Sequence, residues 1–299
     1  MATLYTFAEK NIKKTWILMT IFFVVFALLG WLFSQIFKNQ KILYLAIAFA
    51  FLQNFFGYWY SDKILLAMTG AKEVKKQENP DLYRIVENLS IGAGLPTPKI
   101  YIIEEAQPNA FATGRDKNHA AIAITRGLLE KLEKPELEGV IAHELAHIGN
   151  RDILLQTMVV ILVGAIVLLS DWFLRISRFS AQREREKENR ATILFLFGIL
   201  AAILAPLAAQ LIRFAISRKR EFLADATGAL ITRYPEGLAR ALEKISKDPS
   251  PLKIANNSNA HLFFAFPFRE RRSPSWFSKL FMTHPPVEER IRALREMSI

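Results

Sequence analysis

Residues 136–152 read ELEGVIAHELAHIGNRD and place His143, Glu144 and His147 in the pattern His-Glu-x-x-His. Residues four apart lie on one face of an α-helix, so a single helix would point both imidazole rings at one ion, with the glutamate beside them. Apolar residues recur through this stretch at helical spacing. We therefore predict a helix over residues 135–149 that carries a metal site.

The ligand types available to this site follow from composition. The chain has no cysteine, which excludes disulfides, thiolate ligands and a cysteine nucleophile. Two imidazoles suit Zn²⁺, which in catalytic sites takes three protein ligands and keeps one position open. Two surface histidines reach this spacing by chance on the order of once in a hundred chains of such composition, so the prediction needs a third ligand.

The segment REFLAD, residues 220–225, offers the candidate third ligand. Glu221 and Asp225 are four apart, so on a helix one carboxylate can bind the metal while the other orients a ligand from behind. A solvated helix face beside the basic residues 218–220 is the alternative for this segment taken alone. A site with two histidines and no cysteine requires a further carboxylate or histidine, which favours Glu221.

The remaining histidines have weaker claims to the metal. His119 lies in a polar turn, where we expect it to be solvated, and His261 lies in an apolar stretch, where we expect it to be packed or interfacial. His284 precedes two prolines, which fix the backbone that follows it. Two roles stay open for His284: a structural turn, or a hydrogen-bond donor to the oxyanion formed at a scissile carbonyl.

Long apolar runs flank these motifs. Thr15–Phe37 carries no charge and as a helix would reach roughly 34 Å, enough to cross a hydrocarbon core of about 30 Å. Ile42–Tyr60 follows it, and lysines at both ends of the pair predict a hairpin with its ends on the cytoplasmic side. A cleaved signal peptide is the alternative for the first run, but that run is long and lacks a small-residue cleavage site.

Two further apolar runs, 153–174 and 191–216, predict a second hairpin, with a kink at Pro206. The connection between them, residues 175–190, is rich in arginine and would be translocated against the positive-inside rule. A hairpin that enters the bilayer without crossing it therefore stays open beside full spanning, which we favour.

The polar parts of the chain have the composition of folded soluble protein. Helical spacing marks residues 81–91, and short strands are predicted at 99–103 and 120–125. We predict a mainly α membrane protein with about four transmembrane helices in two hairpins and a small α+β zincin-like domain built from both polar parts. The predicted divisions are 1–63 (first hairpin), 64–152 (first part of the zincin domain), 153–216 (second hairpin) and 217–299 (second part of the zincin domain).

Six motifs follow one another along the chain: LPTPKIYII (95–103), PNAFATGR (108–115), IAITRGLLEKL (122–132), the stretch 136–152, REFLADATGA (220–229) and THPPVEERI (283–291). Together with the apolar hairpins, they resemble the HtpX family of membrane-bound zinc metalloproteases, which are relatives of the CAAX prenyl endopeptidases. The resemblance implies a gluzincin-like endopeptidase that acts on misfolded or membrane proteins in quality control. It also implies the plasma (inner) membrane of a prokaryote, with the active site facing the cytoplasm.

The resemblance also implies roles for individual residues. His143, His147 and Glu221 match the family's ligands to one zinc ion, and Glu144 matches its catalytic acid. One motif looks like the family's edge strand, which would bind substrate backbone by strand addition. Its residues are Asn109, Ala110, Phe111 and Ala112. The stretch HLFFAFPF, residues 261–268, departs from the family's usual sequence, and no role is carried over to it.

Two other functions compete with this one. An intramembrane protease would hold the motif inside an apolar span, whereas here it lies in a polar stretch. A non-catalytic, zinc-stabilised membrane chaperone or scaffold would not need Glu144. The expected partners are a protein or peptide substrate and membrane lipid. The net charge of +11 clusters beside the apolar runs, which indicates anionic headgroups and not nucleic acid. The oligomeric state is not specified by the sequence.

Overall fold

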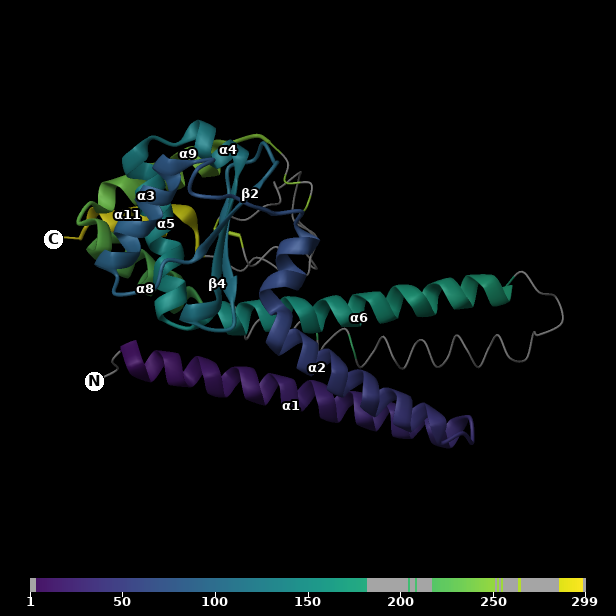
Figure 1. Ribbon diagram of the computed structural model, residues 1–299. Helices are drawn as coiled ribbons and strands as arrows, with labels where there is room; N and C mark the ends of the chain where they lie inside the picture. The colour runs from purple at the N-terminus through teal and green to yellow at the C-terminus, as the bar shows by residue number, and fades with distance from the viewer. Residues whose placement is uncertain are drawn as a thin grey trace.

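Three long helices extend to one side of a compact α+β domain in the computed structural model (Figure 1). The described residues are 4–181, 204, 208, 217–250, 252, 254, 263–264 and 285–297. The three helices are α1 (Leu4–Ile36), α2 (Lys41–Met68) and α6 (Asp152–Ala181). Each contains a segment long and apolar enough to cross a membrane, residues 9–36, 41–68 and 152–169.

The membrane helices pack around their own apolar core. Leu18 and Phe22 of α1 belong to the same buried cluster as Met158 and Leu162 of α6, and Leu204 is also a member. The first predicted hairpin is present as α1 and α2. The predicted fourth span, with Pro206, lies outside the described residues apart from positions 204 and 208.

Helix α6 ends later than the sequence predicted. The charged residues from Arg175 onward were expected to break the helix, yet it continues to Ala181. No proline or glycine lies between Ala165 and Ala181, and arginine is a good helix former, so nothing in the backbone chemistry ends the helix at the first charge.

A four-stranded sheet forms the side of the domain that packs against the membrane helices. Its strands are β1 (Lys72–Glu73), β2 (Lys99–Ile103), β3 (Ala110–Gly114) and β4 (Ala120–Thr125). Their order is β1-β2-β4-β3, with β2 and β4 parallel and the other two pairs antiparallel. The predicted strands at 99–103 and 120–125 are confirmed. In this strand order β3 lies at an edge of the sheet.

The two faces of the sheet are both buried, against different partners. Ala112 and Ile122 face the core of the domain, whereas Phe111 and Ala123 face Leu65 at the end of α2. Successive residues of a strand point to opposite faces, so the alternation in β3 and β4 serves both layers. The sheet thereby fixes the domain against the membrane helices.

The domain's helices cover the other side of the sheet (Figure 1). They are α3 (Pro80–Gly92), α4 (Arg126–Lys131), α5 (Lys134–Gly149), α8 (Arg218–Thr232), α9 (Pro235–Lys247) and α11 (Val287–Arg295), with a short 3₁₀ turn η1 (Lys117–His119).

Helix α5 is the predicted motif helix, and both of its ends are fixed. It begins with a capping box in which Glu133 and Glu136 each bond the other's backbone N–H. After it ends at Gly149, only Asn150 and Arg151 precede α6, and Arg151 takes a left-handed conformation with φ of 58°. The motif helix and a membrane helix are therefore joined by a two-residue turn.

Candidate metal centre

The structure brings together the three predicted metal ligands from α5 and α8. One nitrogen of His143, one nitrogen of His147 and one carboxylate oxygen of Glu221 lie within 4.8 Å of one another, and all three side chains are buried. The two Nε2 atoms are 3.1 Å apart. The Glu221 carboxylate lies 3.9 Å from the Nε2 of His143 and 3.7 Å from that of His147.

Two further carboxylates lie behind the imidazole rings. Asp225 Oδ1 is 2.9 Å from Nδ1 of His143, and Asp152 Oδ2 is 3.0 Å from Nδ1 of His147. Carboxylates in this position fix the tautomer and the orientation of a ligating histidine. The sequence suggested Asp225 for such a role. It did not suggest Asp152, although this residue lies only five positions after His147 at the end of the quoted motif.

These residues fit a bound cation. Each Nδ1 faces a carboxylate, and the two Nε2 atoms face each other beside Glu221, where a metal ion would replace the proton of their hydrogen bond. Burial lowers the pKa of His143 to about 4, which keeps that ring neutral. Burial also acts on His147, but the hydrogen bond to Asp152 and the charge of Glu221 outweigh it and raise its pKa to about 9. The centre thus attracts positive charge, and two imidazoles with one carboxylate suit zinc.

Glu144 lies beside the centre, 2% exposed. Burial raises the pKa of its carboxyl to about 7, although the nearby His147 acts to lower it. The backbone N–H of Ala112 in β3 donates to this carboxylate. A carboxyl group with a pKa near the working pH suits general acid–base chemistry.

The edge of β3 is already partly used by the chain itself. Alternate residues of an antiparallel strand turn their backbone groups away from the paired neighbour. In β3 these include Ala112, which donates to Glu144, and Ala110, whose carbonyl accepts from the N–H of Phe264 at 2.9 Å. Of the four predicted residues, Asn109 donates its N–H to the Oγ1 atom of Thr125 in β4 at 2.8 Å, and Phe111 is buried toward the membrane helices.

Arg290 of α11 is a buried residue of the site that the sequence did not single out. Its Nε and Nη2 donate to the two oxygens of Asp225 at 2.8 and 2.7 Å. Its Nη1 donates to the Phe264 carbonyl at 3.3 Å and lies 3.8 Å from Glu221. Burial alone would raise the pKa of Asp225, but this guanidinium holds it below its usual range. The signal was present, because Arg290 lies within the THPPVEERI motif.

Glycine allows α8 to approach α5 closely enough to complete the centre. A Cβ atom at Gly228 would lie 3.0 Å from the backbone nitrogen of His143 and 3.2 Å from its Cα. Backbone atoms cannot move aside as a flexible side chain can. This glycine, about two turns after Glu221 on α8, therefore sets the distance between the two ligand-bearing helices.

The other predicted residues do not join the cluster in the described part of the chain. His119 is half exposed on η1, as expected, with its Nδ1 2.9 Å from Asp116. His261 and His284 lie outside the described residues, so the two readings of His284 stay open.

A buried His-His-Glu centre with a glutamate beside it, in a domain held against membrane-crossing helices, defines a membrane-bound metalloprotease. Residues 76–298 match Peptidase family M48, and the chain belongs to that family.

The relatives agree with this assignment. The chain is 46% identical over 299 residues to a Protease HtpX homolog of Dictyoglomus turgidum, covering 99% of this chain and 95% of that protein. It is 46% identical over 263 residues to a Protease HtpX homolog of Pyrococcus furiosus, covering 87% of this chain and 88% of that protein. Among solved structures it matches S. mikatae Ste24p with 21% identity and a TM-score of 0.49, covering 94% of this chain and 66% of that one. The resemblance to HtpX is confirmed.

Proposed function

We propose that this metalloprotease is a zinc-dependent endopeptidase that hydrolyses peptide bonds of misfolded or membrane proteins in quality control. The observation that carries the proposal is the convergence of His143, His147 and Glu221 with Glu144 beside them. Its proposed site is the plasma (inner) membrane of a prokaryote, with the active site facing the cytoplasm. The lysines that flank the first hairpin support that orientation, and relatives of bacterial and archaeal origin support the prokaryotic membrane.

The proposed zinc ligands are His143, His147 and Glu221, with one ion per chain. When bound, zinc supplies Lewis-acid polarisation of the scissile carbonyl and lowers the pKa of water from 15.7 toward about 7. Asp225 and Asp152 hold the two rings in the tautomer that leaves each Nε2 free to ligate. Arg290 in turn holds Asp225 with two hydrogen bonds.

Glu144 acts as the general base and then as the general acid. Its carboxylate takes a proton from the attacking water and delivers that proton to the leaving amine of the peptide. A pKa of about 7 allows both directions of transfer near neutral pH. The bond from Ala112 N–H places this carboxylate beside the edge strand, where the substrate backbone is proposed to lie.

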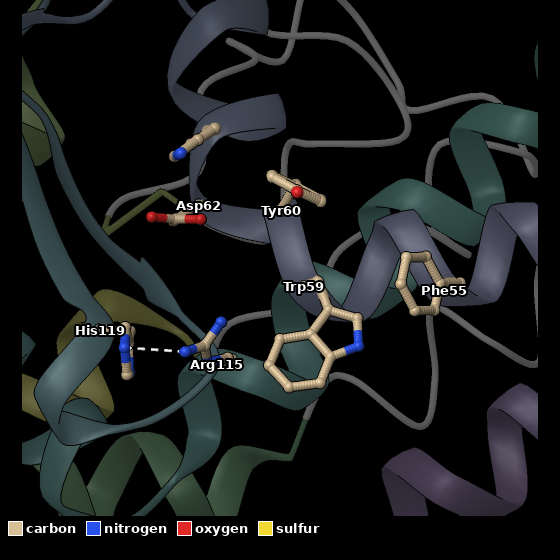
Figure 2. Close-up of a pocket in the computed structure, with 7 residues that line it drawn as sticks. Phe55, Trp59, Tyr60, Asp62, Arg115 and His119 are labelled. Atoms are coloured by element: carbon tan, nitrogen blue, oxygen red, sulfur yellow. Dashed lines mark hydrogen bonds between the residues drawn. The ribbon is translucent and has the colours of Figure 1, made fainter.

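The proposed substrate path follows β3. A peptide adding to the edge of β3 beyond Ala112, whose own N–H is engaged by Glu144, would lie beside Glu144 and continue past Gly114. There it reaches a hollow of about 430 Å³ between α2 and the turn at Arg115 (Figure 2). The lining residues are Phe55, Trp59, Tyr60, Asp62, Lys63, Arg115 and His119.

The chemistry of this hollow suits a segment that leaves the bilayer. The Arg115 guanidinium lies over the ring of Trp59 at 4.8 Å, and the Arg115 Nη2 atom is 2.7 Å from His119 Nε2 (Figure 2). Aromatic rings on α2 meet charged groups of the domain, which is the composition of a membrane–water interface. The hollow therefore favours membrane-protein substrates over fully soluble ones.

The test is hydrolysis by purified full-length protein in detergent. Wild type with zinc is expected to cleave a casein-type substrate, chelator is expected to abolish cleavage, and Glu144→Gln is expected to bind zinc without cleaving. A zinc-loaded wild type that never cleaves, yet suppresses aggregation of an unfolded protein, would support the chaperone alternative instead.

A further inference from the structure

The first membrane helix reaches the metal centre through Asn11. This residue lies in the first third of α1 and is only 4% exposed. Its Nδ2 donates to Asp152 Oδ1 at 2.6 Å and to the Asn150 carbonyl at 3.1 Å. The other oxygen of Asp152 is the one that contacts His147. A side chain near the start of the sequence is therefore two contacts away from a proposed zinc ligand.

The other end of the Asn11 amide faces the second ligand-bearing helix. Arg220 of α8 donates from Nη1 to Asn11 Oδ1 at 3.2 Å, and its Nε lies 3.6 Å from Asp152 Oδ1. Arg220 directly precedes Glu221 and is 5% exposed. Asn11 thus uses both its donor and its acceptor to join the α5–α6 junction, which follows His147, to the start of α8, which carries Glu221.

This arrangement controls the orientation of a carboxylate. Asp152 has two oxygens, and Asn11 holds one of them while His147 engages the other. Without the amide, the buried Asn150 carbonyl and one Asp152 oxygen would lose their donor, which is costly unless the groups rearrange. Rotation of Asp152 toward Arg220 is the available rearrangement, and it would release the ring of His147.

We propose that Asn11 is a positioning residue of the metal centre, through which the first membrane helix sets the affinity for the metal ion. The inference rests on the proposed zinc site. It assigns to α1 a role in the chemistry in addition to its role as a membrane anchor.

A purely structural role is the competing explanation, and the chain offers a matched control for it. Asn54 of α2 is also an asparagine with a hydrogen bond to α1, because its Nδ2 donates to the Met19 carbonyl at 3.1 Å. Among the described residues it makes no hydrogen bond to Asp152 or to the two histidines. Removing Asn54 weakens helix packing without touching the path to the metal.

The experiment measures zinc affinity by chelator competition and melting temperature in full-length protein that also carries Glu144→Gln, so that the protein cannot digest itself. Asn11→Ala is expected to weaken zinc binding by about tenfold. This is the lower end of the loss in metal affinity seen when a residue that hydrogen-bonds and orients a metal ligand is removed. Asn11→Asp keeps the shape but sets a carboxylate against Asp152, and it is expected to lose at least as much. Asn54→Ala is expected to retain wild-type zinc affinity at a lowered melting temperature.

Asn11→Ser keeps one donor and serves if the alanine variant does not fold; it is expected to show an intermediate loss. Unchanged zinc affinity in the Asn11 variants, or an equal loss in Asn54→Ala, would overturn the inference. Absence of zinc binding by the parent protein would remove the metal site and the inference with it. If zinc binding depends on Asn11 but the protein that retains Glu144 never cleaves a peptide, the proposed function is overturned and the inference stands.

Discussion

The Nε2 atoms of His143 and His147 lie 3.1 Å apart, while a separate carboxylate lies behind each ring. An ion bound between two buried rings held in this way would contribute to the stability of the fold as well as to its chemistry. The same geometry would connect the metal to three elements of the chain, since the proposed ligands and the carboxylates behind them come from α5, α6 and α8.

Metal removal is expected to destabilise the protein. Binding to the folded state alone contributes about 4 kcal/mol when free zinc exceeds the dissociation constant about 1,000-fold. Chelator should therefore lower the melting temperature of wild type, measured by calorimetry in detergent. Glu221→Ala should melt at the temperature of chelator-treated wild type, whether or not chelator is present. The exposed control Glu130→Ala should behave as wild type. A chelator effect that persists in Glu221→Ala would contradict the ligand assignment.

Replacement of the proposed base should separate binding from hydrolysis. Glu144→Gln keeps the size of the side chain and removes its ability to take a proton. We expect zinc content equal to wild type and a turnover rate lower by about 10²- to 10⁴-fold. Metal analysis and a peptide cleavage assay on the same preparation check this, and near-normal cleavage would refute the assignment of the base.

Gly228→Ala is expected to weaken metal binding from a distance. The added Cβ would meet the His143 backbone at 3.0 Å, so α8 must shift away and carry Glu221 with it. Overpacking of this kind costs about 1–3 kcal/mol. Chelator competition should show weaker zinc binding than in Gly164→Ala, where a Cβ would have no neighbour within 4 Å. Equal affinity in both variants would show that α8 can adjust without moving its ligand.

The contact between α9 and α11 predicts a dependence of stability on pH. The hydrogen bond from Arg295 lowers the pKa of Glu236 below its ordinary value of 4.5. A carboxyl whose folded-state pKa is lowered stabilises the fold above pH 4.5, and that contribution is lost as the pH falls through the folded-state pKa. At neutral pH, Glu236→Gln should lose less than about 1 kcal/mol, because the pair is partly exposed.

The measurement for this pair is the melting temperature from about pH 7 down to about pH 3. Wild type should lose its advantage over Glu236→Gln at the acid end, whereas Glu288→Gln, on α11, should follow wild type throughout. A constant difference between wild type and Glu236→Gln at every pH would show that the ion pair does not titrate.

Trp59 tests the proposed substrate path. It lines the hollow beyond β3 and lies under Arg115 (Figure 2). Trp59→Ala should lower kcat/KM for a substrate with a membrane-spanning segment by several fold, about 1 kcal/mol of lost contact, and should leave casein cleavage nearly unchanged. Phe56→Ala, on α2 and outside the hollow, is the control. An equal loss on both substrates would indicate a general defect in the enzyme.

The elements predicted correctly from the sequence are those with a local pattern. The strands at 99–103 and 120–125 and the helix containing His143 have a clear period, and the membrane helices have long apolar runs. Glu221 was chosen because two histidines without cysteine required a further carboxylate or histidine, and the other histidines had weaker claims. The family resemblance then matched the same residue, whereas no periodicity connects α8 to α5.

The missed residues share a physical reason. Asn11, Asp152 and Arg290 are polar side chains at the ends of elements or among other charges, and such residues are usually solvated. Each becomes buried only when elements distant in the sequence pack together. The continuation of α6 to Ala181 was missed because charges were taken as a helix break, although they carry no such backbone constraint.

The turn at Asn150 and Arg151 fixes the rotational phase of α6 relative to α5. Because Arg151 takes a left-handed conformation, one residue more or fewer in this turn would change the direction of α6 and move Asp152 away from His147. The conformation of the turn thus makes the length of this junction part of the support for His147.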